Sequence, residues 1–554
     1  MGLLTMVTML FTGCGENGGD SESTSATKKL TAFNLVSPAK NETTSSQTEF
    51  SWEASENAMY YKFQISGKSD FSSLDFQKII NCTSYNIETI LDGNRVYYWR
   101  VVAIGEENRT RIATNSPYII TTEYRYLSVS ADFRDNMVVQ RNSTVNVWGY
   151  AKKNTSVSVD FAGNKKESVS GADGYYCVSF NPMAASSDPH TLTISSAGET
   201  LTVGNVVIGD VILAAGQSNV QWVLKDSDYL ESDLVMKNRA NLRLFSQSDN
   251  PETAEQSQVK GGYWFIPDTY TELDYSALSY LIGYMLEEYN PEIPVGIIFA
   301  AKGDTHIQQW MSKDSFSENW TSVNNGYGGN VYYNGMINPL TKNSLTAVFW
   351  YQGENNAWDS TTYKDYLLSF ASDMRSKFSS PKLPFFIVQL PKYNTDILQN
   401  MWAQFRLVQA EACSADENMH LIVTYDGGDV KAIHPAQKKY IAQRFLLSYR
   451  KYVLLENITA DSPALIKVEI NGSEMILTFG NSDGLYSDGT ITGFEVAGNN
   501  NSYKNATAVI TDGNKITVSC GSISLPVHVR YCFENAPAVN VFNSANLPLA
   551  PFRY

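Results

Sequence analysis

Short segments that alternate between apolar and polar residues fill the chain from residue 30 to residue 124. In the segment at 97–103, the positions on one face are all apolar: Tyr97, Trp99, Val101 and Ala103. A period of two, broken by polar turns, predicts a small β-sandwich with this face turned toward its core. The same pattern continues over 125–205, where a second all-β domain is expected, and returns over 456–554, where a third is expected.

The pattern changes between residues 206 and 455. Short apolar runs here alternate with segments whose apolar residues recur at helical spacing, at 277–288 and 363–378. The runs are 206–215, 295–301, 345–351, 384–390 and 421–425. Continuous apolar strands separated by helices predict a parallel sheet covered on both faces. The expected fold class is therefore multidomain, with one α/β domain flanked by all-β domains.

Composition narrows the class of function. The chain has 554 residues, and 42 Lys and Arg against 57 Asp and Glu give a formal net charge of −15. An acidic chain without a run of basic residues does not suit nucleic acid, so we expect no nucleic-acid partner. Aromatic residues make up 12%, which is typical both of strand-rich folds and of surfaces that stack on sugars.

The first residues resemble the export signal of a bacterial lipoprotein. An apolar stretch over 3–11 leads into Thr12, Gly13 and Cys14, and in such signals the cysteine after small residues carries lipid. Residues 1–14 are thus expected to be the signal and 15–29 a flexible tether; a buried apolar N-terminus is the alternative. We expect an exported lipoprotein of the bacterial cell envelope, periplasmic or surface-facing. It would be anchored and not spanning, because no other stretch approaches the ~18 apolar residues a span needs.

The other five cysteines show no Cys-x-x-Cys spacing. Neither a zinc site nor a dithiol redox site is therefore expected, and we predict no metal and no organic cofactor. Cys520 and Cys532 would pair if they lie on neighbouring strands, and two free thiols are the equal alternative.

Chemically useful side chains follow the apolar runs of the predicted sheet. Ligands gather at the carboxyl ends of strands in open parallel sheets, so these loops are the candidates for a site. They are Gly216-Gln217-Ser218-Asn219, Lys302-Gly303-Asp304-Thr305, Gln352-Gly353-Glu354-Asn355 and Asp426-Gly427-Gly428-Asp429, the last followed by Ile433-His434-Pro435. Together they hold the hydroxyl, imidazole, carboxylates and amide donors that acyl transfer requires.

Few histidines compete for the role of base. Of the five, only His306 and His434 lie near strand ends of the α/β domain. A lone histidine is commonly structural, but a strand-end histidine followed by proline is the better catalytic candidate. We therefore favour His434 as the partner of Ser218.

These motifs, in this order, resemble the sialate O-acetylesterase family, which are carbohydrate esterases of the SGNH hydrolase clan. The resemblance covers about residues 126–554, and 30–124 is similar to a fibronectin type III or immunoglobulin-like module. Its motifs are 135–141, Gly209-Asp210-Val211, 216–219, Ser276-Ala277, 294–297, 333–337, 350–354, Ile433-His434-Pro435 with Lys438, Gly493-Phe494-Glu495, Leu547-Pro548 and Pro551-Phe552-Arg553. It implies an SGNH-type α/β/α catalytic domain at 206–455 that needs no cofactor.

By position, the resemblance makes Ser218 the nucleophile and His434 the general base. It assigns the oxyanion hole to the backbone N–H groups of Ser218 and Gly303 and to the side-chain amide of Gln352. An amide suits a tetrahedral oxyanion because it donates without adding a titrating charge.

The triad acid departs from the clan's Asp-x-x-His arrangement, since Lys431 occupies the position three residues before His434. Glu354 is the preferred substitute, because it already lies in the loop of Gln352, and Asp429 is the alternative. Loop-stabilising roles for both carboxylates stay open. Lys302 and Asp304 also replace the Trp and Gly common in the family, which is expected to alter the acyl or sugar pocket.

Three residues are candidates for contact with the substrate. Trp310 and Trp358 lie near the motif loops, where an indole either stacks on a sugar or packs in the core. Asn219, directly after the nucleophile, is the third.

The resulting expectation is a two-step carbohydrate O-acetylesterase. Ser218 attacks an acetyl ester, the sugar alcohol leaves, and water activated by His434 releases acetate. The resemblance implies O-acetylated sialic acid as the substrate, with acetylxylan or another acetylated glycan as the alternative. A non-catalytic glycan-binding surface lipoprotein is the alternative of another class, and the presence of Ser218, His434 and Gln352 together argues against it.

Overall fold

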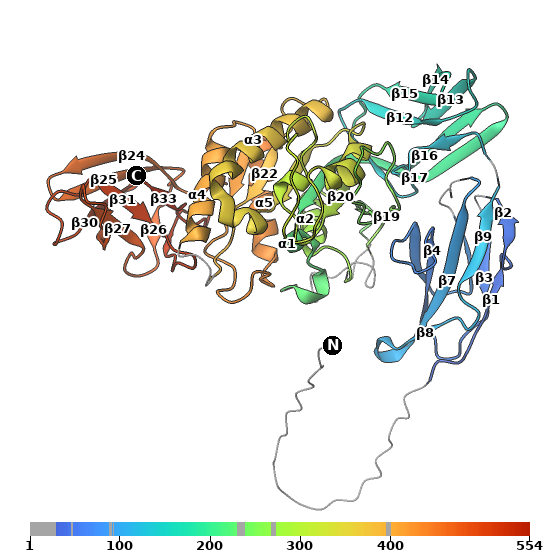
Figure 1. Ribbon diagram of the computed structural model, residues 1–554, viewed down its shortest axis with the longest axis horizontal. Helices are drawn as coiled ribbons and strands as arrows, with labels where there is room; N and C mark the ends of the chain where they lie inside the picture. Colours follow the sequence, from blue (N-terminus) through green and yellow to red (C-terminus); the bar gives the residue numbers. More distant parts are fainter. Residues whose placement is uncertain are drawn as a thin grey trace, which may run out of the picture.

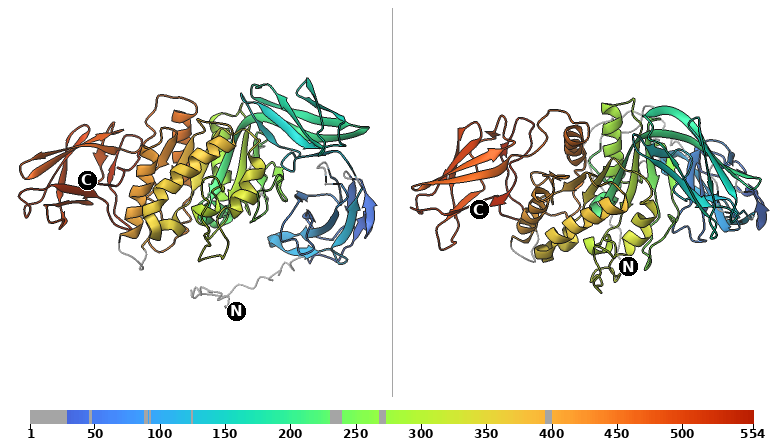
Figure 2. Two further views of the ribbon diagram at one scale, coloured as in Figure 1. Left: turned by 45° about the horizontal axis from the view of Figure 1, so that its top comes forward. Right: turned by 90° about the horizontal axis from the view of Figure 1, so that it is seen from above.

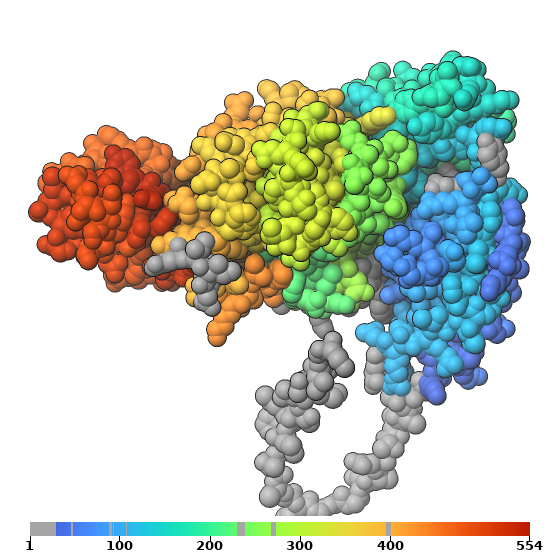
Figure 3. Space-filling view, in the orientation of Figure 1, coloured from blue at the N-terminus to red at the C-terminus, as the bar shows by residue number. Residues whose placement is uncertain are grey.

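The computed structural model describes residues 29–45, 48–87, 91, 93–123, 125–229, 239–267, 273–394 and 400–554. The predicted signal with Cys14, and the tether up to residue 28, lie outside these ranges. The α/β domain occupies the middle of the molecule (Figure 1). The C-terminal β domain forms a lobe at one end, and the N-terminal module lies beside the second β region at the other (Figure 3). The predicted fold class is confirmed.

The N-terminal module is a β-sandwich. One sheet has the order β1-β3-β6, and the other has the order β2-β9-β7-β4-β5 with β8 on β7. Its elements are β1 (Leu35–Ser37), β2 (Glu42–Thr44), β3 (Glu49–Trp52), β4 (Tyr60–Ser66), β5 (Phe76–Ile80), β6 (Ser84–Asn86), β7 (Val96–Ile104), η1 (Glu106–Asn108), β8 (Thr110–Ile112) and β9 (Tyr118–Thr122). The predicted core face on β7 is buried at all four positions, because period-two burial places these side chains between the sheets. The module contacts the α/β domain through the rings of Phe76 and Tyr263, whose centroids lie 6.3 Å apart.

One strand, β17 (Glu199–Gly216), crosses the domain boundary expected between residues 205 and 206. Its first part pairs antiparallel with β16, and its second part pairs parallel with β20 and β21. The strands before it are β10 (Ser128–Val129), β11 (Val138–Gln140), β12 (Val145–Tyr150), β13 (Ser156–Phe161), β14 (Asn164–Val169), β15 (Tyr175–Phe180) and β16 (Ser186–Ser196). The second β region therefore shares a sheet with the α/β domain, and only β10-β12-β15 form a sheet of their own.

The central sheet has the order β19-β18-β20-β17-β21-β22-β23. Every pair along it is parallel except β18 with β19. Besides β17, its strands are β18 (Leu242–Ser246), β19 (Tyr263–Phe265), β20 (Val295–Ala301), β21 (Ala347–Tyr351), β22 (Phe385–Val388) and β23 (Met419–Ile422). Each of the five apolar runs overlaps one of these strands, because a strand covered on both faces is apolar on both.

Two pairs of helices cover this sheet, α2 with α5 on one face and α3 with α4 on the other (Figure 2). The helices are α1 (Ser218–Gln221), α2 (Ala277–Tyr289), α3 (Ser360–Lys377), α4 (Met401–Ser414) and α5 (Lys439–Tyr452). Short helical turns lie between them: η2 (Leu224–Asp226), η4 (Ile307–Gln309), η5 (Tyr333–Ile337), η6 (Asn338–Leu340) and η7 (Glu354–Asp359). No helix in the described part of the chain is long and apolar enough to cross a membrane.

The C-terminal domain is all-β, as expected, with its own apolar core. Its strands are β24 (Ala464–Asn471), β25 (Glu474–Gly480), β26 (Tyr486–Ser487), β27 (Phe494–Ala497), β28 (Lys504–Asn505), β29 (Thr507–Asp512), β30 (Lys515–Ser519), β31 (His528–Tyr531), β32 (Val541–Phe542) and β33 (Phe552–Arg553). Cys520 and Cys532 are both free thiols, as are Cys82, Cys177 and Cys413. Cys520 and Cys532 therefore do not form a disulfide, and the alternative of two free thiols is the one found.

A partly buried ion pair fastens β17 to its surroundings. Arg141 donates from Nε and Nη2 to the two carboxylate oxygens of Asp210 at 2.8 and 3.0 Å. The same carboxylate accepts from the Tyr449 hydroxyl of α5 at 2.8 Å and from Thr346 Oγ1 at 3.1 Å. This cluster explains why Arg141 and Asp210 stand in the motifs noted above, since each satisfies the other in the interior.

Replacing Arg141 with Leu is expected to destabilise the fold by about 3 kcal/mol, because it leaves the Asp210 charge buried without its counter-ion. The free energy of urea unfolding, followed by tryptophan fluorescence, measures the loss. Lys225→Leu is the matched control, since its ion pair with Asp274 is exposed on both sides and such pairs contribute little. Equal midpoints for the two variants would contradict the structural role of Arg141.

Candidate active site

The register of the central sheet brings three of the predicted loops together. Gly216 at the end of β17 is paired with Ala301 of β20 and with Tyr351 of β21, so the chain leaves the three strands at one level. Gly216 has a φ of 148°, and a Cβ there would lie 2.1 Å from the Tyr351 carbonyl oxygen. Only glycine fits this close approach, which turns the chain directly into Gln217 and Ser218.

Ser218 and His434 meet at this edge of the sheet. His434 Nε2 lies 2.7 Å from Ser218 Oγ, although 216 positions separate the two residues in the sequence. The indole of Trp222 stacks on the imidazole at 5.2 Å, with an interplanar angle of 27°. Burial and, to a smaller extent, the Lys438 charge hold the His434 pKa below its ordinary value of 6.5, while the Asp304 charge acts in the opposite direction. The imidazole is thereby poised to accept the hydroxyl proton.

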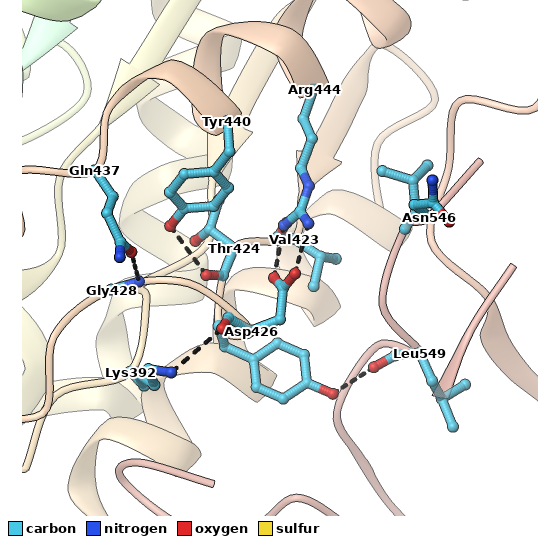
Figure 4. Close-up of polar contacts among 12 residues, drawn as sticks. Lys392, Val423, Thr424, Asp426, Gly428, Gln437, Tyr440, Arg444, Asn546 and Leu549 are labelled. Atoms are coloured by element: carbon cyan, nitrogen blue, oxygen red, sulfur yellow. Dashed lines mark hydrogen bonds and ion pairs between the residues drawn. The ribbon is translucent and has the colours of Figure 1, made fainter. Parts of the chain in front are cut away.

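The segment that carries His434 is fastened at several points before the histidine (Figure 4). Arg444 of α5 binds both oxygens of Asp426 at 2.6 Å. Tyr440 donates to the Thr424 carbonyl at 3.1 Å, and the Gly428 N–H donates to Gln437 Oε1 at 3.1 Å. These contacts tie the loop after β23 to the start of α5, so the loop is held on both sides of His434.

Gly303 lies directly beside the nucleophile. A Cβ on this residue would be 3.4 Å from Ser218 Cβ. Its backbone N–H donates to Gln221 Oε1 at 2.8 Å. The N–H predicted to be an oxyanion donor therefore lies beside Ser218 and is bound to the side chain of Gln221.

Gln352 occupies a different position from the one its predicted role needs. Its side chain is fully buried, and Nε2 lies near three acceptors: Asn356 Oδ1 at 2.8 Å, Gln217 Oε1 at 3.0 Å and the Thr305 carbonyl at 3.2 Å. An amide nitrogen has two hydrogens to give, so these acceptors use both. The structure places Gln352 in the support of the loops and does not bring its amide to an oxyanion.

Glu354, preferred above as the triad acid, is buried and contacts a different partner. Its Oε1 accepts from Asn219 Nδ2 at 2.5 Å, and Asn219 Oδ1 accepts from Lys438 Nζ at 2.6 Å. Burial raises the Glu354 pKa to about 7 and lowers the Lys438 pKa to about 7, and each is drawn back toward its charged form by the other. Within the described residues, Glu354 makes no hydrogen bond to His434.

Asp429, the alternative acid, is exposed, and its Oδ1 accepts from the Lys431 N–H at 2.7 Å. That contact closes the turn in which Asp429 lies. The structure therefore brings neither predicted carboxylate to the imidazole. Among the described charged groups, Asp304 is the one that favours the protonated ring.

The three candidates for substrate contact differ in their exposure to solvent. Trp310 is fully buried, and its indole N–H donates to Thr305 Oγ1 at 2.9 Å, so it has no face for a sugar. Asn219 is also buried and is used by Glu354 and Lys438. Trp358 is 56% exposed and remains available at the end of η7.

Three supporting residues were not singled out by role in the sequence. Gln217 accepts from Gln352, Trp222 stacks on His434, and Lys438 binds Asn219. Lys438 belonged to one of the family motifs, but the motif did not indicate what its side chain does. Gln217 and Trp222 neighbour the nucleophile, and nothing in their spacing shows that Gln217 is buried or that Trp222 covers the imidazole.

The arrangement suits nucleophilic chemistry by a serine. The described residues contain no group of three or more His, Cys, Asp and Glu that could hold a metal ion. A hydroxyl at hydrogen-bond distance from an imidazole, with a backbone N–H beside it, is the minimal equipment for acyl transfer.

Comparisons with known proteins agree with this chemistry. Residues 208–434 match the family described as carbohydrate esterase, sialic acid-specific acetylesterase. The sialate O-acetylesterases of Pongo abelii and Homo sapiens are each 26% identical over 386 residues, covering 61% of this chain and 73% of the relative. A carbohydrate acetylesterase from Xanthomonas citri superimposes with a TM-score of 0.73 at 28% identity, covering 77% of this chain and 99% of that one.

We expect a fluorophosphonate probe to label the protein at one residue, Ser218, because only an activated serine reacts with it. Ser218→Ala should abolish labelling, and His434→Asn should slow it by about a hundredfold or more. Intact-mass spectrometry measures both. Ser227→Ala is the control, because this neighbouring hydroxyl is bound to the Leu224 carbonyl. Labelling that survives Ser218→Ala would contradict the assignment.

Proposed function

Residues 208–434 of this chain match the sialic acid-specific acetylesterase family of carbohydrate esterases, and on that premise we propose that the protein removes acetyl esters from glycans. The observation that carries the proposal is the 2.7 Å contact between His434 Nε2 and Ser218 Oγ at the carboxyl edge of a parallel sheet. A protein that only binds glycans has no use for this pair.

The reaction runs in two steps. His434 takes the Ser218 proton as Oγ attacks the acetyl carbonyl, and the imidazolium then protonates the leaving sugar oxygen. In the second step, His434 takes a proton from the water that attacks the acetyl-serine and returns it to Ser218 Oγ, which releases acetic acid that ionises to acetate. Ester and water are thus converted into alcohol, acetate and a proton without a cofactor.

The N–H groups of Ser218 and Gly303 are the proposed donors to the oxyanion. Gly303 lies against Ser218, and its N–H is occupied by Gln221 Oε1 at 2.8 Å before a substrate is bound. The substrate oxygen would replace that amide oxygen, which makes Gln221 a stand-in for the oxyanion. Each such donor contributes about a hundredfold or more to turnover.

The substrate class follows from the relatives and is proposed at two levels. The coarser level is an acetylated carbohydrate, which the named relatives share. The finer one is O-acetylated sialic acid, and acetylated xylan is the second candidate. Trp358, exposed within η7, is the aromatic surface proposed to contact the sugar.

We further propose that the enzyme is a lipoprotein of the bacterial cell envelope, attached through Cys14. The supporting observation is the sequence before Cys14, which lies outside the described residues. The N-terminal module then stands between the anchor and the catalytic domain.

Acetate release tests the function directly. Wild type is expected to release acetate from O-acetylated sialic acid, and Ser218→Ala should lower kcat by about 10⁴-fold or more. Acetylated xylan, assayed in parallel by the same enzymatic measurement of acetate, separates the two substrates. Release from xylan alone would change the substrate and keep the mechanism, whereas no release from any acetylated glycan would refute the proposal.

The pH profile tests the base. Protonated His434 cannot accept the serine proton, and burial lowers its pKa, so the acid limb of kcat/KM should have its midpoint below pH 6.5. Asp304→Asn removes a charge that raises this pKa and should move the limb to lower pH. A midpoint above 6.5, or a limb that Asp304→Asn shifts upward, would contradict this assignment.

A further inference from the structure

Three buried side chains connect the loops that carry the proposed catalytic residues. Lys438 Nζ donates to Asn219 Oδ1 at 2.6 Å, and Asn219 Nδ2 donates to Glu354 Oε1 at 2.5 Å and to the Ile433 carbonyl at 3.0 Å. Asn219 follows Ser218, Ile433 precedes His434, and Glu354 lies in the loop after β21. One amide thus touches all three loops at once.

The second carboxylate oxygen of Glu354 also has a partner available. In the swapped orientation of the Gln217 amide, which gives up the contact with Gln352 Nε2, the Gln217 nitrogen donates to Glu354 Oε2 at 3.3 Å. In that orientation, residues on both sides of Ser218 are bound to Glu354.

A lysine is a costly choice for this place. Lys438 is fully buried, and removing an ammonium from water costs several kcal/mol unless hydrogen bonds and an opposite charge offset it. An apolar side chain of the same length would fill the same volume without that penalty. The cost indicates that the charge and its hydrogen bond have a task beyond packing.

We propose that Lys438 is a positioning residue for the Ser218–His434 pair, holding the nucleophile turn and the histidine loop in register through Asn219 and Glu354. The inference rests on the function proposed above. In this arrangement, Glu354 is the counter-ion of Lys438. Glu354 affects the reaction through its hydrogen bond with Asn219 and not through the imidazole of His434.

Lys438 also acts on His434 through its charge. Four groups surround the imidazole: Ser218 and Trp222 from the nucleophile turn, Asp304 from the loop after β20, and Lys438 from its own segment. Lys438 favours the neutral ring, and Asp304 favours the protonated one. The charged groups that act on Lys438 are the carboxylates of Glu354 and Asp228. Asp228 Oδ1 also accepts a hydrogen bond from the backbone N–H of Lys438 at 2.7 Å. The neutral imidazole is the form that can act as base.

The test compares Lys438→Met, Glu354→Gln and the double variant by steady-state kinetics of acetate release. Lys438→Met should lower kcat by about tenfold to a hundredfold with KM within about twofold, because a misplaced nucleophile slows chemistry more than binding. Its acid limb of kcat/KM should move to higher pH. Lys364→Met, at a half-exposed lysine of α3, is the control and should behave as wild type.

Glu354→Gln separates this inference from a triad-acid role. Gln keeps an oxygen that accepts from Asn219, so less than about a tenfold loss of kcat is expected, whereas an amide in place of a triad acid costs about 10⁴-fold. The double variant carries no lone buried carboxylate. It should regain the melting temperature that Lys438→Met loses while its kcat stays low, which distinguishes positioning from stability.

A readout independent of activity is the titration of His434 by NMR. The chain has five histidines, and His434→Asn identifies the resonance by its loss. Lys438→Met should raise the His434 midpoint. Wild-type kcat in Lys438→Met with an unmoved titration, recovery of kcat in the double variant, or a 10⁴-fold loss in Glu354→Gln would each overturn the inference. If wild type releases no acetate at all, the proposed function fails, and the titration still decides whether Lys438 acts on His434.

Discussion

The parallel pairing of β17 between β20 and β21 sets the position of every group at the site. Hydrogen bonds along both edges of β17 align Gly216 with Ala301 and Tyr351. Because the three strands end at one level, the residues that follow them emerge side by side, which is why ligands gather at this edge of open α/β sheets. A shift of one residue in either ladder would turn Ser218 away from His434.

The ends of the strands are held by amides more than by charges. Below the nucleophile, Gln352 donates to Gln217 and to Asn356. The Tyr363 hydroxyl donates to Gln352 Oε1 at 3.0 Å. Neutral amides satisfy several loop groups at once and cost less to bury than ions. Lys438 and Glu354 lie where the nucleophile and histidine loops meet, and the Arg444–Asp426 ion pair holds the histidine segment against α5. Amides thus set the geometry below the nucleophile, and charged groups hold the segment that carries the base.

Much of this arrangement could be predicted from the sequence. Apolar runs located β17, β20, β21, β22 and β23 of the central sheet, because burial on both faces leaves little choice of residue, and strand ends located Ser218 and His434. The direction of a polar side chain at a strand end could not be predicted, since one step along the chain reverses it. Gln352 was therefore expected to face the oxyanion and Asn219 the substrate, yet both lie inside, and Trp310, for which stacking and core packing were both open, packs in the core. The boundary at 205/206 failed for a related reason: the change from alternating to continuous apolar residues occurs within β17, where one strand passes from a half-covered sheet to a fully covered one.

The unpaired cysteines have a practical consequence. Cys413 and Cys532 are buried, where an apolar environment raises the thiol pKa of Cys413 and, to about 12, that of Cys532, so the reactive thiolate is scarce. Because Cys413 and Cys532 lie inside the fold, a thiol reagent reaches them only when the surrounding structure opens, so the rate of their modification reports on local unfolding.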